Sequence, residues 1–103
     1  MSLRGQDRAA LRAEAHHLRA TVHIGTHGIT EAVRRSLDEA LTARELVKLR
    51  FERGADVRPR EGANSLAGSL AADVVQVIGH TATLFRENPA LDHSPDKPPP
   101  WKR

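Results

Sequence analysis

The most informative stretch of the sequence is VHIGTHGIT at residues 22–30. Val22 and Ile24 alternate with polar residues, which is the period of a short strand with one buried face, and Gly25 ends that strand. Thr30 is a suitable N-cap for a following helix. The apolar residues behind it recur at helical spacing: Val33, Leu37, Ala40 and Leu41. The stretch therefore predicts a strand that passes through a tight turn into a helix ending near residue 43.

The turn itself is Gly25-Thr26-His27-Gly28, a G-x-x-G sequence. Glycines permit tight backbone geometry and close approach by another molecule, and the free N–H groups and positive dipole end of the next helix attract a phosphate. RNA-binding KH modules clamp backbone nucleotides with a loop of this form. Alone, the motif is weak, because any tight strand-to-helix turn can contain two glycines.

Upstream of this unit, apolar residues at helical spacing predict a first helix over residues 7–19. Arg8, Arg12 and Arg19 would lie along one side of that helix, beside its apolar face. We therefore expect a basic edge on the first helix.

Downstream, residues 45–52 (ELVKLRFE) alternate with the period of a strand. Lys48 and Arg50 would share the face opposite its most apolar residues. A turn-rich connection over residues 54–59 leads to a third helix, which apolar periodicity marks over residues 63–71.

Two β-branched segments, residues 74–78 and 81–86, end the periodic part of the chain. Only Gly79-His80 separates them, which is typical of a β-hairpin. The predicted order is αβαβαββ, an α/β two-layer domain over residues 1–87. Residues 88–103 are rich in proline and basic at their end, so we expect a disordered tail there.

Composition excludes several classes of protein. The 103 residues contain no cysteine, which removes disulfides, thiolate nucleophiles and most structural zinc sites. The amino terminus lacks the apolar region of a signal peptide, and no uncharged stretch is long and apolar enough to cross a bilayer. We expect a cytoplasmic, monomeric protein with no membrane partner.

The charge is unevenly distributed along the chain. Residues 1–60 hold 12 basic and 8 acidic residues, whereas residues 61–96 hold one basic and five acidic residues. A basic half of this kind indicates a surface for a polyanion, with nucleic acid favoured over membrane. An arginine-rich proteome would give the same excess, so charge alone leaves both interpretations open.

Three further segments give the G-x-x-G turn a context: AHHL at residues 15–18, ELVKLRF at residues 45–51 and VQVIGHTATLFR at residues 75–86. Together with the turn, and in this order, they resemble the CRM domain, specifically the small stand-alone YhbY-like proteins of bacteria. The resemblance implies a fold like the carboxy-terminal domain of translation initiation factor three, with a four-stranded mixed sheet packed against helices. It also implies RNA binding and association with precursors of the large ribosomal subunit.

The resemblance also implies site residues. The family's turn maps onto Gly25, Thr26, His27 and Gly28, and its basic strand positions onto Lys48 and Arg50. Its basic residues before the first strand and at the end of the last strand map onto Arg19 and Arg86. Family members often have lysine where this chain has Thr26 and His80, so two cations are lost or depend on pH.

Two more arginines are candidates from their position alone. Arg12 lies on the basic edge, and Arg34 lies one turn into the helix that follows the glycines, within reach of a bound phosphate. Arg35 has the same reach, but Glu31 precedes it by four residues, the spacing of a surface ion pair. We therefore favour Arg34.

The sequence shows no signature of catalysis, and we expect neither a metal nor a cofactor. Six histidines are present, but His23 and His27 flank a glycine break without an acidic or cysteine ligand. The expected function is non-catalytic RNA binding, with recognition of RNA shape more than of bases. The alternative is an adaptor that docks a ribosomal protein or assembly factor through its sheet or its Pro-rich tail.

Overall fold

A computed structural model describes residues 5–90 of the chain. The tail beyond residue 90, for which we expect disorder, lies outside the described residues. The elements are α1 (Gly5–Ala15), β1 (Ala20–Ile24), α2 (Glu31–Arg44), β2 (Leu46–Phe51), α3 (Pro59–Leu70), β3 (Asp73–Ile78) and β4 (Thr81–Phe85). The predicted order αβαβαββ is confirmed.

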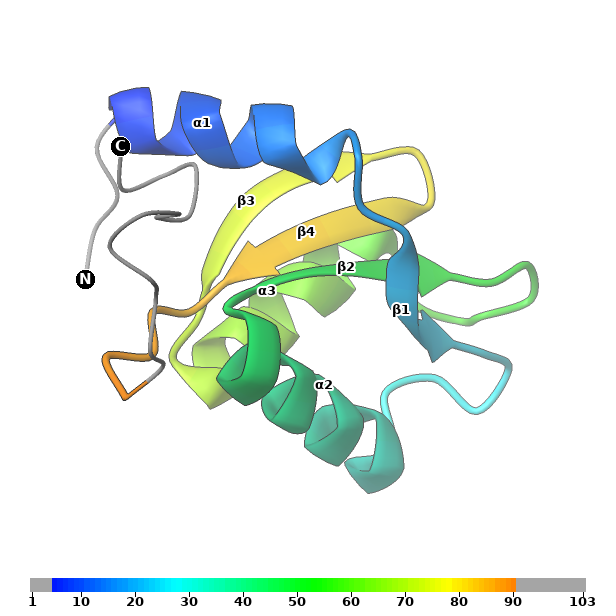
Figure 1. Ribbon diagram of the computed structural model, residues 1–103. Coiled ribbons are helices and arrows are strands. Elements are labelled where there is room, and N and C mark those ends of the chain that lie inside the picture. The colour runs from blue at the N-terminus through cyan, green and yellow to red at the C-terminus, as the bar shows by residue number, and fades with distance from the viewer. Residues whose placement is uncertain (1–4, 91–103) are drawn as a thin grey trace.

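The four strands form one mixed sheet in the order β1-β2-β4-β3. β1 and β2 are parallel and are joined through α2, since parallel neighbours need a crossover connection, whereas β4 runs antiparallel to both β2 and β3. The helices α2 and α3 cover one face of the sheet, and α1 lies across the other face (Figure 1). The sequence-based expectation of a four-stranded mixed sheet packed against helices is confirmed.

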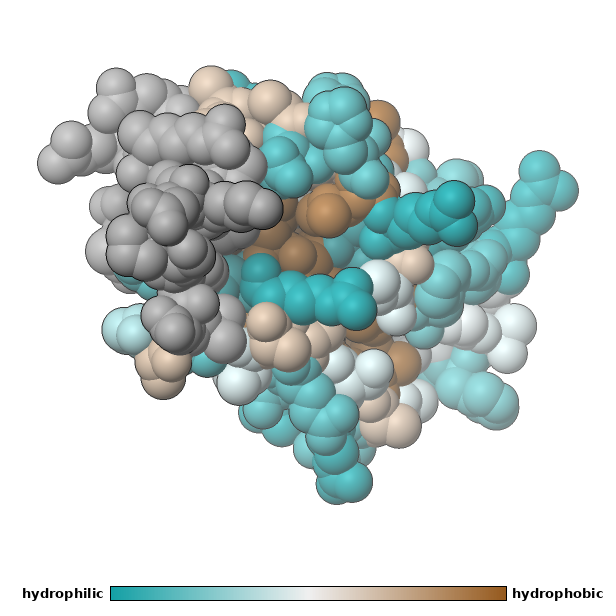
Figure 2. All heavy atoms as spheres, in the orientation of Figure 1, coloured by the Kyte–Doolittle hydropathy of each residue, from teal (hydrophilic) through white to brown (hydrophobic). Residues whose placement is uncertain are grey.

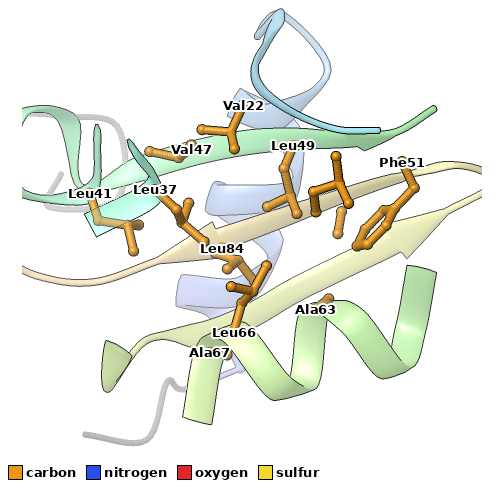
Figure 3. Packing of buried hydrophobic residues seen from close by; sticks show 12 residues of the cluster. Val22, Leu37, Leu41, Val47, Leu49, Phe51, Ala63, Leu66, Ala67 and Leu84 are labelled. Carbon is orange, nitrogen blue, oxygen red and sulfur yellow. The ribbon is translucent and has the colours of Figure 1, made fainter. Parts of the chain in front are cut away.

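The main core lies between the sheet and the pair α2 and α3. Alternation on β2 turns Val47, Leu49 and Phe51 toward these helices, and each side chain is at most 2% exposed (Figure 3). A second cluster packs on the other face under α1: Leu11, Leu46, Val75 and Phe85, with Leu18 against them. The two inner strands of the sheet, β2 and β4, each contribute residues to both clusters.

The helix α1 ends at Ala15, four residues earlier than the periodicity predicted. The backbone N–H groups of His17 and Leu18 bond to Glu14 and Ala15 at 3.1 Å in a tight turn, so Leu18 reaches the second cluster from outside the helix. Arg19 therefore precedes β1 and does not continue a helical basic edge. Leu18 has the spacing of a helical residue, so the sequence pattern alone did not reveal that it lies outside α1.

The helix α3 begins at Pro59, earlier than the expected start at residue 63. Proline suits the first helical position because its missing N–H has no partner there. In the next turn, a Cβ added to Gly62 would lie 2.6 Å from Cε1 of Phe51 and 2.8 Å from Cγ1 of Val57. Gly62 thus allows α3 to approach β2 closely, and this contact fixes the loop between them.

The segment after β4 is tied to α2 by a set of hydrogen bonds that we call the C-terminal anchor, made by Asp38, Thr42, Glu45, Arg86 and Asn88. Glu45 is fully buried at the end of α2; its carbonyl accepts from Arg86 N at 2.9 Å and its Oε2 accepts from Asn88 N at 2.7 Å. Asn88 Nδ2 donates to the Thr42 carbonyl at 2.8 Å. Residues 86–88 are therefore fixed against the body of the domain.

Candidate functional site

Three loops meet at one end of the sheet, which we call the loop end: residues 25–28, 52–58 and 79–80. The first two follow the parallel strands β1 and β2, whose carboxyl ends lie together, and the hairpin arrives there because β4 is antiparallel to β2. Glu52 N donates to Ile24 O at 2.8 Å, and Phe51 N donates to His80 O at 2.7 Å. These bonds join the three loops, which project on the right of Figure 1.

The turn at Gly25–Gly28 closes with a hydrogen bond from Gly28 N to Gly25 O at 2.9 Å. Gly28 has φ +70°, a left-handed conformation that favours glycine, and a Cβ there would lie 3.5 Å from Cγ2 of Val57. Gly25 is different, since a Cβ on it would meet nothing within 4 Å. The turn thus needs Gly28 for its shape, and Gly25 leaves its backbone open on one side.

The side chains of Thr26 and His27 are both exposed at the tip of this turn. No carboxylate lies within Gly25–Gly28, so an anion meets only backbone, hydroxyl and imidazole groups there. Behind the turn, α2 begins with the predicted cap, because Thr30 Oγ1 accepts from Val33 N at 3.1 Å. The turn can therefore present N–H groups to an anion without a competing negative side chain of its own.

Arg34 does not point at this turn. Its Nε donates to Ser69 Oγ at 3.4 Å, at the far end of α3, and its guanidinium lies 3.5 Å from the carboxylate of Glu31. The expected pair between Glu31 and Arg35 is thus replaced by an i,i+3 pair with Arg34. The prediction that Arg34 reaches a phosphate at the glycines does not fit this geometry.

Lys48 and Arg50 share one sheet face, as predicted, but their surroundings differ. Lys48 is half-buried, and its Nζ donates to Ala15 O at 3.2 Å, which satisfies a carbonyl at the end of α1. Arg50 is exposed beside the loop end, 3.8 Å from Glu52, whose Oε1 lies 2.7 Å from Nδ1 of His23. Lys48 therefore supports the fold, and Arg50 is the more available cation.

Arg86 lies at the opposite end of β4 from the three loops. Its guanidinium donates to Asp38 Oδ1 at 2.8 Å, Asp38 O at 3.0 Å, Thr42 Oγ1 at 2.9 Å and Leu70 O at 3.1 Å. A guanidinium with these four bonds ties β4 to α2 and α3. We assign Arg86 a structural role and correct the expectation that it contacts the same ligand as the glycines.

Two predicted site residues of the amino-terminal region, Arg12 and Arg19, are exposed. Arg12 lies in the last turn of α1, and Arg19 lies just before β1, at the end of that strand away from the glycines. Arg8, the third member of the expected basic edge, is committed elsewhere, because its Nη1 donates to Val74 O at 2.8 Å. Arg12 and Arg19 can extend an interface along the molecule but do not belong to the loop end.

The structure adds two arginines that sequence reasoning missed, Arg53 and Arg58. Both are exposed on the loop after β2, and within residues 5–90 neither side chain has a hydrogen-bond or ion-pair partner. This loop packs on the glycine turn, since a Cβ at Gly54 would lie 3.4 Å from Cγ2 of Thr26. Figure 2 shows hydrophilic side chains gathered at this end of the molecule. The two arginines could have been found from the parallel pairing of β1 and β2, because this pairing places the glycine turn and the loop after β2 at the same end of the sheet.

Within residues 5–90, no group of three or more His, Cys, Asp or Glu side chains is placed to hold a metal ion. In the same part of the chain, no helix is long and apolar enough to cross a membrane.

Comparisons with known proteins point to one family. The sequence model of the CRS1 / YhbY (CRM) domain matches residues 3–86. The chain is 31% identical over 86 residues to "Probable RNA-binding protein YqeI" of Bacillus subtilis, covering 84% of this chain and 90% of that protein. It is 40% identical over 86 residues to "Probable RNA-binding protein MJ0652" of Methanocaldococcus jannaschii, covering 82% of this chain and 63% of that protein.

A solved structure has the same fold. The solution structure of the hypothetical protein SAV1595 from Staphylococcus aureus matches with a TM-score of 0.73 at 31% sequence identity. The match covers 84% of this chain and 91% of that one. The similarity therefore spans the three helices and the sheet together.

Proposed function

Because the chain belongs to the CRS1/YhbY (CRM) domain family, we propose that it is a non-catalytic RNA-binding protein whose loop end holds the phosphate backbone. The relatives YqeI and MJ0652 carry RNA binding in their names, which supports this function. The glycine turn supplies backbone N–H groups, and Arg50, Arg53 and Arg58 supply positive charge around it. Phosphate contacts of this kind position an RNA without specifying its sequence.

One observation carries the proposal: the contrast between the two glycines of the turn. Gly28 is required by its own φ of +70°, but nothing in the fold fills the space beside Gly25. A side chain could be accommodated there without a clash inside the protein. An external group can therefore approach the backbone of the turn at this open position.

The resemblance to YhbY-like proteins also supports a proposal for the biological partner. We propose that the RNA is ribosomal, that the protein acts as a monomer on a precursor of the large subunit, and that this occurs in the cytoplasm. Sedimentation of a cell lysate tests this, because the protein should travel with immature large subunits. Co-sedimentation that survives ribonuclease treatment would instead favour the adaptor that docks a ribosomal protein or assembly factor.

The direct test replaces the open glycine. We expect Gly25→Val to weaken binding of the full chain to a single-stranded octacytidylate about tenfold, the effect of losing one hydrogen bond to a charged group. Gly68→Val is the matched control, because Gly68 is an exposed glycine of α3 with nothing within 4 Å of an added Cβ. Equal affinities of both variants and the unaltered protein, with thermal melts unchanged, would contradict the proposal.

A further inference from the structure

A groove of about 560 Å³ opens beside the glycine turn, between the loop after β2 and the β3–β4 hairpin. The groove and the turn share a wall. Gly54 and Val57 line the groove, and the same two residues lie against Thr26 and Gly28 of the turn. The remaining lining comes from the end of β2, the rest of the loop, the first turn of α3 and the hairpin: Phe51, Glu52, Arg53, Ala55, Asp56, Arg58, Pro59, Glu61 and His80.

The groove has the size of a small-molecule site, since such sites measure about 300–1,000 Å³. It is also within reach of an RNA held at the turn. β1 and β4 are separated by β2, and neighbouring strands lie about 4.8 Å apart, so the hairpin is about 10 Å from the turn. A short stretch of single-stranded RNA spans that distance.

The charges on the lining argue against a bare phosphate as the occupant. Arg53 and Arg58 are accompanied by three carboxylates, those of Glu52, Asp56 and Glu61. These carboxylates repel an anion, whereas the glycine turn contains no acidic residue at all. The two neighbouring sites therefore suit different parts of one nucleotide chain.

A nucleobase can interact with both the cationic and the acidic side chains of the groove. Its faces stack on guanidinium planes and imidazole rings, which Arg53, Arg58 and His80 provide. Its exocyclic amine donates hydrogen bonds that a carboxylate accepts, as cytosine N4 does to Asp or Glu. The apolar lining from Ala55, Val57 and Pro59 contacts the rest of the ring.

We propose that this groove takes one unpaired nucleobase of the RNA whose phosphate lies at Gly25–Gly28. The inference rests on the proposed function and deepens it. A base inside a duplex is stacked and paired, so the groove selects single-stranded loops, bulges or ends. It also adds base recognition to the shape recognition expected from the sequence.

The test asks whether removal of a carboxylate from the groove strengthens or weakens RNA binding. Removing any carboxylate raises the net positive charge, which strengthens binding to RNA in general. For Asp56→Ala the groove predicts the reverse: affinity for octacytidylate falls about threefold to tenfold, because the base loses a hydrogen-bond acceptor. Glu39→Ala is the matched control, since Glu39 is also exposed but lies on α2. It should leave octacytidylate binding unchanged or slightly tighter.

A second measurement locates the base. Amide NMR spectra of the full chain are recorded with cytidine 5′-monophosphate and with ribose 5-phosphate. We expect both compounds to shift the amides of residues 25–28, and only the nucleotide to shift those of residues 53–58 and His80. Identical patterns, or an Asp56→Ala variant that binds octacytidylate more tightly as a surface charge change would, overturn the groove. If the unaltered protein binds neither octacytidylate nor a 12-base-pair RNA duplex, the proposed function itself fails.

Discussion

The two ends of the sheet use arginine in opposite ways. At the C-terminal anchor, the guanidinium of Arg86 makes four hydrogen bonds to α2 and α3, and its side chain is only 21% exposed. At the loop end, Arg53 and Arg58 are exposed, and within residues 5–90 the side chain of neither makes a hydrogen bond or an ion pair. The same residue type therefore serves the fold at one end and remains available for a ligand at the other.

The role of a basic residue therefore depends on the groups that its side chain contacts, and its position in a sequence motif does not reveal that role. A guanidinium whose donors are satisfied inside the protein would have to exchange those bonds to bind a phosphate. A guanidinium that faces only water exchanges solvent and counterions. The comparison predicts that stability and RNA affinity respond to separate sets of arginines.

The largest expected effect is at the anchor. Arg86→Ala removes four hydrogen bonds and leaves Asp38 and the Leu70 carbonyl without them, so it should lower the free energy of unfolding by about 2–3 kcal/mol. For a chain of this size that corresponds to a melting temperature roughly 10 °C lower. Affinity for octacytidylate, measured well below the transition, should stay the same. Arg35→Ala, at an exposed position of α2, is the control; a stable Arg86→Ala variant with weakened RNA binding would reverse our assignment.

The next effect is at the loop end, and it concerns affinity. The double variant Arg53→Ala, Arg58→Ala should weaken octacytidylate binding about tenfold and change the free energy of unfolding by no more than about 0.5 kcal/mol. Two fewer positive charges beside the RNA backbone should also make the slope of log affinity against log salt shallower, by up to roughly 1.4. The matched control replaces Arg35 and Arg44, two exposed arginines of α2. An equal loss in both double variants would mean that only total charge matters.

The smallest effect is again on stability alone. Ala71 ends α3 at φ 54° and ψ 41°, a left-handed conformation that a side chain disfavours. Ala71→Gly should raise the free energy of unfolding by about 0.5–1 kcal/mol, measured by urea denaturation, and leave RNA affinity unaltered. An RNA affinity that follows this change would show that the two ends are coupled.

Much of the fold was predictable because local patterns specify it. The alternation of Val47, Leu49 and Phe51 identified the strand β2, and Thr30 identified the start of α2. The errors occurred at helix ends, where the deciding contacts are not periodic. Leu18 has helical spacing but packs from a turn, and α3 begins at Pro59 although Arg58 provides no side-chain cap.

The site was less predictable, since it depends on contacts between segments far apart in the sequence. The residues that bind the Arg86 guanidinium lie 16 to 48 positions away, so the motif around it gave no sign of its structural role. Arg53 and Arg58 belong to no motif and join the glycine turn only through the parallel pairing of β1 and β2. The glycine turn itself was visible because its residues are consecutive.

We infer that RNA contacts the loop end and not the C-terminal anchor. The most direct measurement is photo-crosslinking of the full-length protein to RNA in cells, followed by mass spectrometry of the crosslinked peptides. We expect crosslinked residues within 25–28 and 52–58, with additional sites at His80. Crosslinks confined to α2, α3 or the segment around Arg86 would contradict the account.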